Sequence, residues 1–190
     1  MVLLIVDTQN LIMTNELYEY EQFISNVKKL ISVSRENHIE VIYIRHDDGI
    51  ELTRGVNGFE IFKEFEPMLN EQIFDKHVNS AFKESGLLEY LNQQKENKVI
   101  IAGLQTDYCI DATIKCGFEH GIEMIVPAFC NTTEDNEFLK AEQSYKYYNE
   151  KMWNKRYSKC ISFNDAIALL KRQSNGKNGD IYPEISEKII

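Results

Sequence analysis

The chain has 190 residues, 43% of them apolar and 27% charged, and its formal net charge is −9. These values are typical of one globular domain that folds without disulfides or structural zinc, and they exclude collagen-like, low-complexity and wholly disordered proteins. The acidic balance and the lack of a basic run argue against nucleic acid or an anionic membrane as a partner.

Short apolar runs rich in Val, Ile and Leu alternate along the chain with segments of helical spacing. In chain order the pattern predicts a strand at 2–6, a helix at 18–37, strands at 41–44 and 72–74, a helix around 87–91, a strand at 99–102, a helix at 106–119, a strand at 124–126, a helix at 138–153, a strand at 160–162 and a helix at 164–171. This alternation predicts right-handed crossovers and a three-layer α/β/α, Rossmann-like domain with a mostly parallel six-stranded sheet.

Two segments between or beyond these elements have no clear period. Residues 47–65 hold three glycines, and the length of the segment favours a lid over a site. Residues 174–180 have the composition of a flexible linker. We therefore expect one domain over residues 1–172, followed at 173–190 by a linker and a tail that is either frayed or packed on a neighbouring subunit.

We find no sequence motif for a signal peptide, a membrane helix or a metal site. The first apolar run covers only residues 2–6, too short for a signal peptide or for the roughly 20 residues of a membrane helix. The four cysteines form no C-x-x-C pair, so we expect free thiols in a reducing, cytoplasmic compartment. The four histidines are scattered and support no protein-built metal site.

Polar residues follow three of the predicted strands, where ligands bind in open parallel sheets. They are Asp7, Lys76 and Cys109. Thr106 is a plausible N-cap, which places Cys109 in the first helical turn, where the dipole and free N–H groups favour a thiolate and can stabilise an oxyanion. Taken singly, each residue also has a structural explanation: a loop cap, a solvated lysine and a small apolar side chain.

The order of these motifs resembles the isochorismatase-like cysteine hydrolases, the superfamily that includes nicotinamidases and N-carbamoylsarcosine amidohydrolases. The matching pieces are Leu-Ile-Val-Asp-Thr-Gln-Asn at 4–10, Lys76 followed by Ser-Ala-Phe at 80–82, and Gly-Leu-Gln-Thr-Asp-Tyr-Cys-Ile-Asp-Ala-Thr at 103–113. The resemblance covers roughly residues 1–172. It implies the isochorismatase-like hydrolase fold, a small-molecule substrate and a homodimer or homotetramer.

The resemblance also implies roles for the three residues. Cys109 is the nucleophile, Asp7 the base that takes its proton, and Lys76 the neighbour that orients both. The chemistry agrees, because a thiol needs a base at neutral pH and Asp7 alone would disfavour a nearby thiolate. The family further carries a cis peptide before the residue matching Gln105, which turns a backbone N–H inward so that Gln105 and Cys109 form the oxyanion hole.

The chain departs from the nicotinamidase pattern where those relatives hold a metal. The segment Ile-Arg-His-Asp-Asp-Gly at 44–49 lacks the second and third histidine, and Leu11 stands where the family frequently has Asp. With Gly-Phe-Glu-Ile at 58–61 and Pro67, this resembles the metal-free branch and implies neither a metal nor a cofactor. His46 either contacts the substrate or only forms a hydrogen bond with the loop. The predicted substrate contacts are Gln9, His46, Phe59 and Tyr108.

Three functions remain open at this point. The first is a metal-independent hydrolase that cleaves a C–N bond of a small carboxamide or carbamoyl compound through a thioester on Cys109. The second is an isochorismatase-type vinyl-ether hydrolase with Asp7 as the acid; such relatives can do without the cysteine, so its presence favours acyl transfer. The third is a non-catalytic binding or scaffold protein, against which the intact set of Asp7, Lys76 and Cys109 argues.

Overall fold

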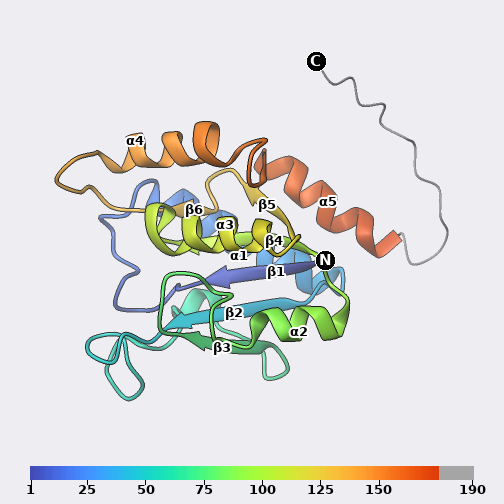
Figure 1. Cartoon of the computed structure of the whole chain (residues 1–190), viewed down its shortest axis with the longest axis horizontal. Coiled ribbons are helices and arrows are strands. Elements are labelled where there is room, and N and C mark those ends of the chain that lie inside the picture. Colours follow the sequence, from blue (N-terminus) through green and yellow to red (C-terminus); the bar gives the residue numbers. More distant parts are fainter. Residues whose placement is uncertain (176–190) are drawn as a thin grey trace.

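A parallel β-sheet crosses the middle of the molecule, with helices on both of its faces (Figure 1). The computed structural model describes residues 1–175. The strands are β1 (Val2–Val6), β2 (Val41–His46), β3 (Gln72–Lys76), β4 (Lys98–Leu104), β5 (Glu123–Pro127), β6 (Asn131–Thr132) and β7 (Lys159–Ile161). They are ordered β3-β2-β1-β4-β5-β7, with β6 pairing the end of β4, and these pairings are all parallel. The predicted fold class is confirmed, and β6 is a short additional strand.

The helices lie close to their predicted positions. They are α1 (Tyr20–Glu36), α2 (Leu87–Gln94), α3 (Asp111–Glu119), α4 (Ala141–Lys146) and α5 (Phe163–Asn175). Two segments of π geometry, η2 (Thr106–Ile110) and η3 (Tyr147–Trp153), join α3 and α4 respectively, and a short 3₁₀ turn, η1 (Lys63–Phe65), precedes β3. The predicted lid segment therefore contains only this one turn of helix. Residues 176–190, with most of the predicted linker and the tail, lie outside the described residues.

The side chains of β1 alternate between two hydrophobic cores, one on each face of the sheet. Leu3 and Ile5 belong to the core beneath α1 and α5, whereas Val2, Leu4 and Val6 belong to the core beneath α2 and α3. A strand whose successive side chains point to opposite faces is apolar throughout only when both faces are covered. The continuous apolar run at the amino end of the sequence therefore marks a central strand.

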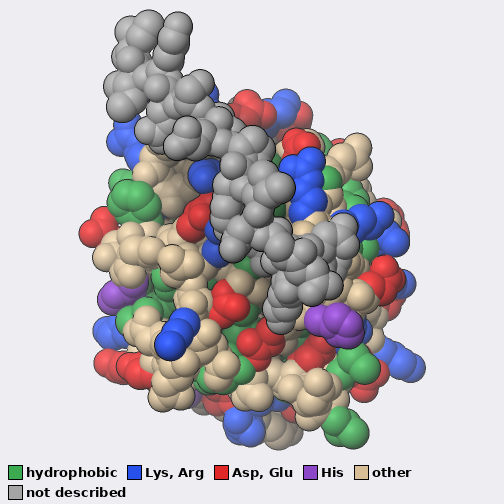
Figure 2. Space-filling view, turned by 90° about the vertical axis from the view of Figure 1, so that its right-hand side faces the viewer, with side chains coloured by type: hydrophobic (Ala, Val, Ile, Leu, Met, Phe, Trp, Pro, Cys, Tyr) green, Lys and Arg blue, Asp and Glu red, His purple; other side chains and the backbone are tan. Residues whose placement is uncertain are grey.

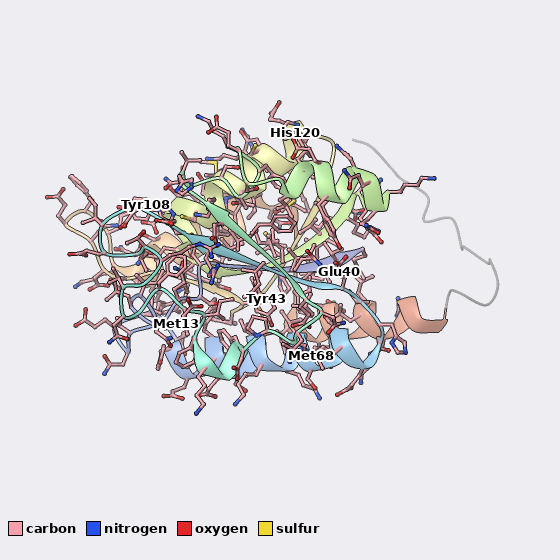
Figure 3. All side chains as sticks on the ribbon, turned by 90° about the horizontal axis from the view of Figure 1, so that it is seen from below. Met13, Glu40, Tyr43, Met68, Tyr108 and His120 are labelled. Carbon is pink, nitrogen blue, oxygen red and sulfur yellow. The ribbon has the colours of Figure 1, made fainter. Side chains whose placement is uncertain are left out.

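The carboxyl ends of the strands meet at one end of the molecule. Figure 3 shows Tyr108 and Met13 at this end, Glu40 and Met68 towards the opposite end, and Tyr43 between the layers. At the opposite end, acidic and basic side chains are interspersed wherever the described residues are visible (Figure 2). Within residues 1–175, none of the helices combines the length and the apolarity that crossing a bilayer requires.

Close contact between β1 and β4 depends on a single glycine. Gly103 pairs with Val6 and has a φ of +134°, a conformation that side chains rarely adopt. A Cβ at this position would lie 2.0 Å from the carbonyl oxygen of Val6. The absent side chain lets β4 run directly beside β1, which brings the residues that follow the two strands together.

Candidate active site

The three residues predicted to be catalytic meet at the carboxyl ends of three strands. Asp7 follows β1, Lys76 ends β3, and Cys109 lies in η2 after β4. Lys76 Nζ lies 2.7 Å from Asp7 Oδ2 and donates a hydrogen bond to Cys109 Sγ at 3.2 Å. It also lies 2.8 Å from His46 Nδ1. Lys76 is completely buried and Cys109 is 8% exposed, so the group is largely removed from bulk water.

Asp7 reaches this position through an unusual backbone conformation. Its φ is +53°, in the left-handed region that only a few per cent of non-glycine residues adopt, Asp among the most tolerant. Its N–H still donates to the carbonyl of Ile44 at 2.9 Å, so the strand pairing extends to this residue. The chain thus leaves the sheet at Asp7 itself, and conformations of this kind are concentrated at functional sites.

The start of the helix holds the cis peptide that the resemblance implies, between Leu104 and Gln105. The prediction that Thr106 is the N-cap is wrong: Gln105 occupies that position, without a side-chain cap. Thr106 is fully buried, and its hydroxyl donates instead to Asn131 Oδ1 at 2.8 Å. Cys109 remains in the first turn, and this turn has π geometry, which is often associated with functional sites.

Burial dominates the protonation of the sulfur. It raises the pKa of the Cys109 thiol to about 12, and the negative charge of Asp7 adds to this effect, while Lys76 opposes it. The helix start was expected to favour a thiolate; in the free site, burial and the charge of Asp7 favour the protonated thiol instead. Activation of Cys109 requires a base that removes the proton during the reaction.

Asp7 has the properties of that base. Burial raises its pKa above the ordinary value, with the charge of Lys76 as the main opposing influence. Oδ2 contacts the Lys76 ammonium, whereas Oδ1 is buried and has no hydrogen-bond partner within residues 1–175. A buried carboxylate oxygen left unpaired is costly, and here it is the position available to a proton.

The group faces a cavity of about 230 Å³. Five predicted site residues line it: Asp7, His46, Gln105, Tyr108 and Cys109. Four lining residues were not predicted individually: Ile12, Asp48, Leu52 and Asn79. Asp48 and Leu52 belong to the segment 47–65 that was predicted to be a lid over the site. A larger hollow of about 400 Å³ beside Phe118 and Tyr157 contains no cysteine or histidine, so we assign the chemistry to the smaller cavity.

Gln9 and Phe59 lie behind the cavity wall. Both are fully buried, and neither lines the cavity. The Gln9 amide donates to the carbonyls of His46 and Phe59, at 3.0 and 2.8 Å, and accepts a hydrogen bond from the N–H of His46 at 2.7 Å. Phe59 packs beneath the guanidinium of Arg45. These contacts fix the end of β2 and the following loop.

Sequence reasoning missed Asn79 and Asp48. Asn79 lies three residues after Lys76, and its Oδ1 is 3.9 Å from Cys109 Sγ. Asp48 lies in the 47–65 segment that the sequence predicts to be a lid over a site, but no motif marks this residue individually. In both cases the available signal was proximity in sequence to a motif residue.

Asp7, His46 and Cys109 are close enough to bind one metal ion, because their ligand atoms lie within 4.8 Å of one another. The Lys76 ammonium, however, contacts all three residues. A divalent ion bound by these three residues would be repelled by the buried Lys76 ammonium, which already contacts each of them. Burial and Lys76 also lower the pKa of His46, so its neutral Nδ1 can accept a hydrogen bond from the ammonium. Within the described part of the chain, this group of residues therefore does not fit a metal.

Comparisons with known proteins agree with the observed fold. A family model described as the isochorismatase domain matches residues 1–151. The isochorismatase family protein YddQ of Bacillus subtilis (strain 168) is 28% identical over 144 residues, covering 69% of this chain and 77% of that protein. A crystal structure of an isochorismatase family protein has a TM-score of 0.80 at 27% identity, covering 85% of this chain and 97% of that one. N-carbamoylsarcosine amidase from Thermoplasma acidophilum shares the fold, with a TM-score of 0.71 at 20% identity over 86% of this chain and 96% of its own.

Proposed function

The chain belongs to the isochorismatase family of hydrolases, and from this premise we propose that it is a metal-independent cysteine hydrolase. Its substrate is a small carboxamide or carbamoyl compound, and the bond that it cleaves is C–N. The observation that carries the proposal is the meeting of a buried carboxylate, ammonium and thiol at the wall of one small cavity. The amidase activity named for the fold neighbour from Thermoplasma acidophilum supports the same substrate class.

In the proposed reaction, each of these side chains has a defined role. Asp7 Oδ1 takes the proton of Cys109 as the sulfur attacks the carbonyl carbon and the C–S bond forms. The backbone N–H groups of Gln105 and Cys109 hold the resulting oxyanion. Asp7 then returns the proton to the nitrogen as the C–N bond breaks, and ammonia or an amine leaves. Water cleaves the thioester, with Asp7 accepting its proton and returning it to the sulfur. Throughout, Lys76 holds Asp7 Oδ2 and the sulfur in place.

Replacement of the nucleophile tests this proposal. We expect Cys109→Ala to lower ammonia release from small amides by a factor on the order of 10⁴, because no thioester can form. The measurement is a coupled ammonia assay across a panel of amides, with circular dichroism and urea unfolding to show that the fold is intact. Cys116→Ala is the matched control, since Cys116 lies two turns further along the same helix and does not line the cavity.

Ether hydrolysis with Asp7 as the acid is the alternative that the family and the raised pKa of Asp7 favour. In that case Cys109→Ala keeps its activity while Asp7→Asn loses it. Retained amide hydrolysis in Cys109→Ala would contradict the thioester mechanism directly.

A further inference from the structure

The cavity beside Cys109 carries a net negative charge at its wall, and we infer that it selects substrates bearing a positive charge, with Asp48 as the specificity-determining residue. The inference rests on the proposed function and narrows its substrate class. The inferred substrate is a small amide with a short apolar stem that ends in an ammonium or guanidinium group.

The charges that surround the cavity do not cancel. Two carboxylates line it, Asp7 and Asp48, and within residues 1–175 no lysine or arginine does so. Asp7 is neutralised by the completely buried Lys76, which leaves Asp48 without a counter-ion at the wall. Arg45 and Arg54 both contact Asp75. His46 lines the same cavity as Asp48, but burial and Lys76 lower its pKa, so the neutral imidazole does not offset the charge of Asp48.

The fold gives no structural reason for a charge at Asp48. Its Oδ1 accepts hydrogen bonds from the N–H groups of Ile50 and Leu52, at 2.8 and 3.0 Å, which shape the loop after β2. An asparagine carbonyl would accept the same two bonds. The negative charge therefore adds nothing that the turn needs, while it attracts cations to the cavity and repels anions from it.

The remaining walls suit a short apolar stem. Ile12, Leu52 and Tyr108 line the same cavity. Its volume of about 230 Å³ limits the occupant to a small molecule. A ligand with its carbonyl at Cys109 and a short stem along these side chains would direct its other end towards Asp48.

Charged thiol reagents measure this preference without requiring turnover. The probes are methanethiosulfonates that carry a trimethylammonium or a sulfonate group, and peptide mapping by mass spectrometry follows their reaction at Cys109. Rates are divided by those of the same reagents with 2-mercaptoethanol. The ratio of the cationic to the anionic rate then cancels any change in ionisation of the sulfur.

We expect the wild-type protein to favour the cationic reagent and Asp48→Asn to lower the ratio about tenfold. Asp47→Asn is the matched control: it removes the same charge from the neighbouring residue, whose carboxylate accepts the N–H of Gly49 and does not line the cavity. The control is expected to change the ratio by no more than about twofold. An unchanged ratio in Asp48→Asn, or a wild-type preference for the sulfonate, would overturn the inference.

Three amides of similar size extend the test to catalysis: 3-aminopropanamide, butanamide and succinamate. We expect the cationic amide to have the lowest KM, and Asp48→Asn to lower the preference for the cationic amide over butanamide, measured as the ratio of their KM values, about tenfold. If the enzyme hydrolyses none of them in a Cys109-dependent reaction, the proposed amidase function fails for small amides. The reagent ratio still decides the role of Asp48 in that case.

Discussion

Lys76 is the residue on which the geometry of the site depends. A completely buried ammonium is stable only with close hydrogen-bonding partners, and Lys76 has three: Asp7, His46 and Cys109. The three partners come from different strands: Asp7 follows β1, His46 ends β2, and Cys109 follows β4. One side chain therefore fixes the relative positions of Asp7 and Cys109, and its charge offsets that of Asp7.

The pH dependence of alkylation tests the electrostatics at this scale. Because burial raises the pKa of Cys109 to about 12, the thiolate fraction is small at neutral pH and grows about tenfold per unit as the pH rises. We expect the rate of Cys109 alkylation by iodoacetamide to keep increasing from pH 7 to 10, as measured by peptide mass spectrometry. N-acetylcysteine amide is the control, and its rate levels off as the pH passes the usual thiol pKa of about 8.5. A plateau at Cys109 near pH 9 would contradict the raised pKa.

The sequence predicts only part of the site. Asp7, Lys76 and Cys109 follow strands, and motifs mark them, so their meeting could be anticipated. The raised pKa of Cys109 could not be anticipated, because it depends on burial that neighbours distant in sequence produce. Asp48 was missed for a similar reason: its place at the cavity wall results from the path of a loop without periodicity.

At the scale of elements, the contact between β1 and β4 brings Asp7 and η2 together. The apolar runs predict both strands well, since burial on both faces leaves a clear pattern. The two-residue β6 has no such pattern. The predicted helix over 106–119 is continuous in the structure, but nothing in its spacing indicates that the first turn has π geometry.

A methyl group at Gly103 tests the importance of this contact. We expect Gly103→Ala to lower the free energy of unfolding by about 3 kcal/mol or more, because the new Cβ would overlap the Val6 carbonyl and the backbone φ is unfavourable for alanine. Urea unfolding measures the change. Gly121→Ala is the control: its φ is also positive, at +75°, but the space around it is open, so we expect a loss of only about 1 kcal/mol. Equal losses in the two variants would show that the close approach is unimportant.

At the scale of the whole molecule, one sheet separates two apolar cores. Val27 of α1 lies in one core and Ile114 of α3 in the other, and both are fully buried. Hydrophobic periodicity predicts such a layered arrangement because each helix presents one apolar face. The homodimer or homotetramer stays a prediction, since surfaces between copies leave no comparable period in a single sequence.

The separation of the cores makes a prediction about combined substitutions. We expect Val27→Ala and Ile114→Val each to lower the free energy of unfolding by about 1–2 kcal/mol. The double variant should lose the sum of the two to within about 0.5 kcal/mol, because the two residues belong to separate hydrophobic clusters on opposite faces of the sheet. Urea unfolding of the two single variants and the double variant provides the comparison. A larger deviation would mean that strain passes through the sheet.

The contact of Lys76 with both Asp7 and Cys109 lowers the electrostatic cost of the proton transfer in the proposed reaction. When the proton moves from sulfur to carboxylate, the sum of the charges on the three residues is the same before and after. The interior therefore gains no net charge, and the surrounding water responds only to the displacement of a negative charge. A negative charge only shifts across a few ångströms beside a fixed positive one, so a sulfur that is almost never ionised at rest becomes a competent nucleophile for the brief interval in which a carbonyl is present to receive it.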